Sequence, residues 1–106
     1  MLRLRKKQLR EVTCLPTQAY TDTTGGIGRV TTGNHFTFKA ALLPPKRAIT
    51  RTVSGVRLAL TWTLLPEGAP PCREQDRLVF PGDSRVFTIT AIKRSPRFLA
   101  FHLELL

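Results

Sequence analysis

The chain has 106 residues, of which 42% are hydrophobic, and a formal net charge of +10. This length fits one domain, residues 1–106, with a small core of its own, and the hydrophobic content argues against a disordered chain. The positive charge favours polyanions as partners, nucleic acid first or an acidic protein surface, although a merely solvated basic surface would give the same composition.

The first residues, 1–8, lack the apolar core of a signal peptide, and no apolar run is long enough to span a bilayer. The two cysteines, Cys14 and Cys72, fit buried, reduced thiols better than a disulfide framework. We therefore expect a soluble protein, made and folded in a reducing cytoplasm, without a membrane partner.

Residues 1–10 are predicted to form a basic arm, and its cations are candidates for binding a partner: Arg3, Arg5, Lys6 and Lys7. Residues 10–16 alternate well enough to predict a first strand, which a proline ends. Residues 17–34 are rich in threonine, glycine, aspartate and asparagine, so they are predicted to be a long mobile connection.

A second strand is predicted over residues 35–43, where four apolar side chains share one face: Phe36, Phe38, Ala40 and Leu42. The pair Pro44–Pro45 ends it, because two residues without N–H groups cannot continue a ladder. Residues 44–54 are then predicted to be an exposed loop that projects from the domain. Its candidates for contact with phosphate or a partner are Pro44, Pro45, Lys46, Arg47 and Arg51.

The clearest strand begins at Gly55, and one of its faces is apolar throughout: Val56, Leu58, Leu60, Trp62 and Leu64. This alternation predicts an antiparallel strand that is buried on one side. Residues 66–72 form a turn-rich connection to a β-hairpin over residues 76–92, which reverses at Pro81–Ser84. In its second strand Phe87, Ile89 and Ala91 point one way, while Ile92 points the other.

A last strand is predicted over residues 99–105, which brings the total to about six strands, and no segment has helical periodicity. The fold class predicted is therefore all-β: a small antiparallel barrel or sandwich with a long exposed loop after the second strand.

Motifs for catalysis or metal binding are weak. The glycine-rich run 24–28 has neither the strand nor the helix that a nucleotide-binding loop needs, and Cys14, His35, Cys72 and His102 do not have the spacing of zinc ligands. We expect no enzymatic activity, no cofactor and no metal.

The order of these parts resembles the head–tail joining family of long-tailed bacteriophages, the head-closure or stopper proteins. The resemblance runs from the basic start through the glycine-rich turn to a final strand of the pattern hydrophobic-x-L-x-L. It includes a D-R-x-x-x-x-G-x-x-x-F-x-I-x-x-I pattern, matched by Asp76, Arg77, Gly82, Phe87, Ile89 and Ile92 with one extra residue between Gly82 and Phe87. The double proline and the acid-free middle of the chain depart from the family pattern.

The resemblance implies a β-barrel subunit of the virion neck that assembles into a ring, expected to be a dodecamer, below the portal. Its partners would be the portal or adaptor protein, a tail-completion or tail-terminator protein, and packaged double-stranded DNA near the channel. The segment 44–54 would either plug that channel or pack on a neighbouring subunit. Such a protein is located at the head–tail interface of the virion, and in the host cytoplasm during assembly.

Two other functions fit the same sequence. One is a small basic β-barrel that binds DNA or RNA as a monomer, with an affinity that falls steeply with salt. The other is a tail terminator or another neck protein of similar architecture.

Overall fold

The structure of the chain, a computed structural model, describes residues 9–21 and 23–106, and all of its regular elements are strands. Within these ranges the side chains of residues 48, 50–52 and 57 are not described. The strands are β1 (Arg10–Leu15), β2 (Thr17–Thr21), β3 (Ile27–Thr31), β4 (Phe36–Leu42), β5 (Lys46–Thr52), β6 (Gly55–Pro66), β7 (Arg77–Val79), β8 (Val86–Arg94) and β9 (Leu99–Leu105). None of the described segments is a helix that could cross a membrane.

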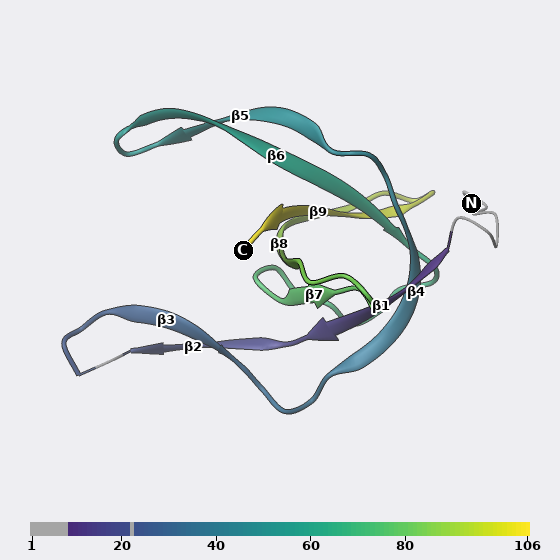
Figure 1. Ribbon diagram of the computed structural model, residues 1–106, viewed down its shortest axis with the longest axis horizontal. Helices are drawn as coiled ribbons and strands as arrows, with labels where there is room; N and C mark the ends of the chain where they lie inside the picture. The colour runs from purple at the N-terminus through teal and green to yellow at the C-terminus, as the bar shows by residue number, and fades with distance from the viewer. Residues whose placement is uncertain (1–8, 22) are drawn as a thin grey trace.

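Six of the strands form a closed antiparallel barrel in the order β4-β1-β7-β8-β9-β6. The barrel closes where β4 meets β6, with Ala40–Leu42 paired to Leu64–Pro66. β4 can take part in both ends of the sheet because its first part, Phe36–Ala40, pairs with β1. The small antiparallel β-barrel predicted from the sequence is confirmed, and Figure 1 shows it on the right of the molecule.

Aromatic rings fill much of the barrel interior. Phe87 lies edge-on to both Phe80 and Trp62, with ring centroids 5.5 and 5.1 Å away. Phe101 makes a similar contact with Phe38 of β4. Because such pairs stabilise a core beyond the area that they bury, these contacts tie β4 to β9 and β6 to β8.

Two β-hairpins extend from the barrel on the same side of the molecule (Figure 1). The β2–β3 arm comprises residues 17–31, which form a separate two-stranded sheet. The β5–β6 arm comprises residues 46–61, where β5 pairs with the first half of β6. β6 therefore serves two structures, since its second half belongs to the barrel wall.

The prediction of a mobile connection over residues 17–34 was wrong, because most of this segment is the β2–β3 arm. The Tyr20 ring lies over Gly28 on the opposite strand, where a Cβ atom would be 2.6 Å from the ring. An aromatic side chain that covers a cross-strand glycine compensates for the packing that the glycine lacks. A composition rich in threonine and glycine therefore led to the prediction of a loop where the chain forms two paired strands.

The described side chains of the segment 44–54 are exposed as predicted, but residues 46–52 form the strand β5 and not a loop. β5 pairs with β6 over its whole length, from Lys46 opposite Thr61 to Thr52 opposite Gly55. The prediction that the alternating residues of 55–65 are all buried was also wrong for the arm. Only Trp62 and Leu64 are buried, because they lie on the part of β6 that belongs to the barrel.

The second strand of the predicted hairpin contains a β-bulge between Ile89 and Ala91. Phe87 and Ile89, which were predicted to share one face, are buried, but Ile92, which was predicted to point the other way, packs against the core as well. An extra residue in one strand shifts the alternation of side chains by one position, which explains this difference.

Candidate assembly and polyanion-binding surface

The β5–β6 arm extends the inward-facing side of the barrel wall into solvent. In an antiparallel pair, directly opposed residues have side chains on the same face. Ile49 is opposite Leu58, and Arg47 is opposite Leu60, so these four side chains lie on one face of the arm. Trp62 and Leu64 lie on the same side of β6, farther along in the barrel wall. We define the arm face as the exposed part of this side: Arg47, Ile49, Val56, Leu58 and Leu60.

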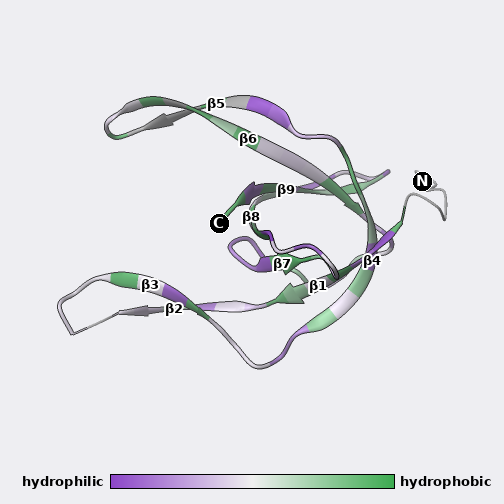
Figure 2. Cartoon of the chain, in the orientation of Figure 1, coloured by the Kyte–Doolittle hydropathy of each residue, from purple (hydrophilic) through white to green (hydrophobic). Residues whose placement is uncertain are grey.

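The apolar side chains of the arm face are uncovered. Ile49 is 72% exposed and Leu58 67% exposed, whereas Leu64 on the same side of β6 is 0% exposed. Figure 2 shows hydrophobic segments recurring along β6 from the tip of the arm to the barrel. Contiguous exposed apolar residues on a small protein mark an interaction surface.

The predicted phosphate-contacting residues are divided between two faces. Pro44 and Pro45 are exposed at the base of the arm, between β4 and β5. Lys46 is opposite Thr61 and Arg47 is opposite Leu60, so successive cations of β5 point to opposite sides. Arg51 pairs with Val56 through its backbone, and its side chain is not described. The candidate arm residues Arg3, Arg5, Lys6 and Lys7 lie outside the described residues.

The β2–β3 arm is anchored to the barrel at Asp76, a carboxylate that is 2% exposed. Its Oδ1 accepts a hydrogen bond from the Thr17 backbone N–H at 3.0 Å, and its Oδ2 accepts one from the Arg73 backbone N–H at 2.9 Å. The Thr17 hydroxyl in turn donates to the Gln75 carbonyl and accepts from the Arg29 side chain. The first residue of the arm is thus bonded to the loop before β7.

Cys14 and Cys72 are both buried and both free thiols. Hydrogen bonding to Cys72, burial and the nearby Asp76 carboxylate raise the pKa of the Cys14 thiol far above its ordinary value. The Cys14 Sγ lies 3.8 Å from Asp76 Oδ2. Cys14 is therefore held as a neutral thiol that packs beside the buried carboxylate, and the predicted burial of both cysteines is confirmed.

Asp83 and Arg85 close the turn between β7 and β8. The Arg85 guanidinium bonds both oxygens of Asp83, the shortest contact being 2.8 Å, and it lies 5.2 Å from the centroid of the Phe87 ring. The Arg85 side-chain and backbone hydrogen bonds lower the pKa of Asp83 from 3.8 to about 2.

This pair predicts an acid-sensitive contribution to stability. Because the pKa of Asp83 is lower in the folded chain, its contribution is complete above 3.8 and is lost as the pH falls toward 2. Thermal unfolding should show a smaller drop in Tm on acidification for Asp83→Asn than for the parent chain. Glu74→Gln, which removes an exposed carboxylate elsewhere, is the control. Equal drops for Asp83→Asn and the parent would contradict the prediction.

Sequence reasoning missed the arm face and the role of Asp76. The arm face had a visible signal, because β6 is 12 residues long and strands in globular proteins usually have about five or six. A strand twice that length can extend beyond a small barrel. Asp76 had no comparable signal, since its hydrogen-bond partners are backbone groups 3 and 59 residues away.

The described residues contain no cluster of three or more histidine, cysteine, aspartate or glutamate side chains that could hold a metal ion. The sequence matches no protein-family model and no curated protein.

Proposed function

We propose that the chain is a structural assembly protein of a virion neck, of the head-closure type. In this role it forms a ring below the portal, joins head to tail and helps to retain packaged DNA. The observation that carries the proposal is the arm face, an apolar surface continuous with the barrel core but held outside it. The resemblance noted in the sequence gives the biological setting.

The arm face supports self-association between unlike surfaces. The barrel is closed, so its wall offers few free strand edges, whereas the outer edge of β5 is unpaired within the described residues. A projecting arm on one copy that packs on a different surface of the next copy makes a heterologous contact, and such contacts generate rings when the rotation closes. Burial of Leu58 and Ile49 between copies would supply the hydrophobic free energy.

The test is the oligomeric state of matched arm variants, measured by sedimentation and by electron microscopy. Leu58→Asp places a charge on the arm face, and Ala59→Asp places the same charge on the opposite face of the same strand. We expect Leu58→Asp to weaken self-association about tenfold or more while Ala59→Asp leaves it nearly unchanged. A parent chain that stays monomeric at high concentration, even with a portal protein present, would refute the proposal.

The dependence of DNA binding on assembly distinguishes this function from that of a monomeric nucleic-acid-binding barrel. In a neck ring the cations of many copies add up, so binding should appear with assembly and weaken as salt rises. A monomeric binder should hold DNA as well with Leu58→Asp as with Ala59→Asp, because the two variants carry the same added charge and only the first prevents assembly. Fluorescence anisotropy of a labelled duplex with these two variants distinguishes the two functions.

A further inference from the structure

A groove lies between the end of β6 and the turn that joins β8 to β9. Its walls are residues 65–69 and 94–99, and it encloses about 420 Å³. This volume is within the range of small-ligand pockets and accommodates a large side chain of a bound peptide. Figure 1 shows the β8–β9 turn on the side of the molecule away from the tips of the two arms, so the groove is separate from the arm face.

The walls of the groove are held in place by the chain itself. The Ser95 hydroxyl oxygen accepts hydrogen bonds from the backbone N–H groups of Arg97 and Phe98, and the Ser95 N–H donates to the Phe98 carbonyl at 3.0 Å. On the other wall the Glu67 N–H donates to the Lys39 carbonyl, and Gly68 has a φ of 72°. A preformed site loses little conformational entropy when it binds a partner.

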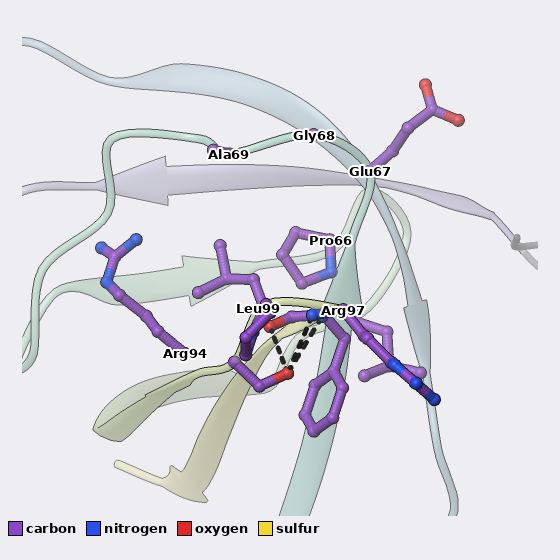
Figure 3. Close-up of a pocket in the computed structure, with 11 residues that line it drawn as sticks. Pro66, Glu67, Gly68, Ala69, Arg94, Arg97 and Leu99 are labelled. Atoms are coloured by element: carbon purple, nitrogen blue, oxygen red, sulfur yellow. Dashed lines mark hydrogen bonds between the residues drawn. The ribbon is translucent and has the colours of Figure 1, made fainter. Parts of the chain in front are cut away.

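The groove combines an apolar lining with positive charge. Pro66 and Leu99 contribute apolar surface, and the Phe98 side chain is 48% exposed. Arg94 and Arg97 are exposed at the groove, and no ion pair holds either of them within the described part of the chain. Glu67 is the one carboxylate of the lining, and Figure 3 shows its side chain pointing away while the two arginines extend to either side.

We propose that this groove binds a peptide segment of a partner protein that carries a bulky apolar residue flanked by carboxylates. The apolar residue would cover Phe98 and Leu99, and the carboxylates would pair with Arg94 and Arg97. A nucleic-acid backbone fits less well, because phosphates would meet the arginines but leave the apolar lining exposed. The net charge of +10 disfavours a second copy of the chain as the occupant.

An array of ten-residue peptides in four matched sets tests the proposal. The first three sets have an apolar centre with acidic flanks, an apolar centre with neutral flanks, and a polar centre with acidic flanks. The fourth set has an apolar centre with basic flanks. We expect selective binding of the first set, with amide shift changes in the NMR spectrum confined to residues 65–69 and 94–99. The double substitution Arg94→Glu and Arg97→Glu should weaken that binding about tenfold or more. The double substitution Arg73→Glu and Lys46→Glu, an equal charge change at exposed residues outside the groove lining, should not.

Three results would overturn the proposal. The first is that peptides with an apolar centre and basic flanks bind as tightly as those with acidic flanks. The second is that the amide shift changes lie outside the groove. The third is that the double substitution of Arg94 and Arg97 leaves binding unaffected. Tighter binding of a DNA duplex than of any peptide, at the same residues, would assign the groove to nucleic acid instead. The groove can bind its peptide whether or not the chain forms a ring, so a monomeric parent chain would leave this result unchanged.

Discussion

Leu64→Ala is expected to lower the free energy of unfolding by about 2 to 5 kcal/mol, whereas Leu58→Ala should change it by less than about 0.5 kcal/mol in the monomer. The two leucines lie on the same side of β6, but Leu64 is 0% exposed and Leu58 is 67% exposed. Removing a buried side chain leaves a cavity and loses hydrophobic burial, while removing an exposed one does neither. Urea unfolding at low protein concentration measures both values.

In an assay of self-association, the order of the two variants should be reversed, with the larger effect coming from Leu58→Ala. Leu58→Ala is expected to weaken self-association, because Leu58 belongs to the arm face. Leu64→Ala should lower stability without a matching change in association of the folded fraction. Equal loss of stability in the two monomeric variants would mean that the arm packs on the barrel in solution, which would contradict the projecting arm of Figure 1.

Asp76→Ala is expected to destabilise the chain by about 2 to 4 kcal/mol, because two partly buried backbone donors lose their charged acceptor. The Thr17 N–H lies at the base of the β2–β3 arm and the Arg73 N–H in the loop before β7. Both segments should therefore lose protection from amide hydrogen exchange together. Urea unfolding gives the change in stability, and exchange monitored by NMR locates it.

Two controls define what the Asp76 side chain contributes. Asp76→Asn keeps one carbonyl oxygen as an acceptor, so we expect about half of the destabilisation of Asp76→Ala. Glu74→Ala removes an exposed carboxylate from the same loop and should change stability by less than about 0.5 kcal/mol. If Asp76→Ala is no more harmful than Glu74→Ala, the carboxylate does not anchor the arm.

The barrel was predictable from sequence because its strands have regular alternation between turn residues. Phe36 and Phe38 pack against the core and Ala40 is buried, as the pattern predicted, and the same holds for Phe101 and Leu103 of β9. Each of these strands has one buried face, so a period of two in hydrophobicity reports it directly.

The arms were not predictable in the same way, because neither hairpin buries a face in this chain. Tyr20 and Gly28 pair across the β2–β3 arm, but a lone aromatic among threonines and glycines gives no alternating pattern. In β6 the sequence shows the alternating pattern along the whole strand, but only half of the strand has a core to pack against. Alternation alone cannot distinguish Leu58, which is exposed to solvent, from Leu64, which is buried in the core. Burial depends on what lies opposite a strand, which is a property of the whole fold.

The seam that closes the barrel pairs Ala40–Leu42 of β4 with Leu64–Pro66 of β6, and backbone hydrogen bonds at Leu43 and Glu67 extend it at either end. The strand on one side of this seam continues without interruption into the projecting arm. A load applied to the arm tip is therefore transmitted along the backbone of β6 into the barrel wall, where β6 pairs with β4 and β9. A partner bound at the tip would therefore pull directly on the barrel wall.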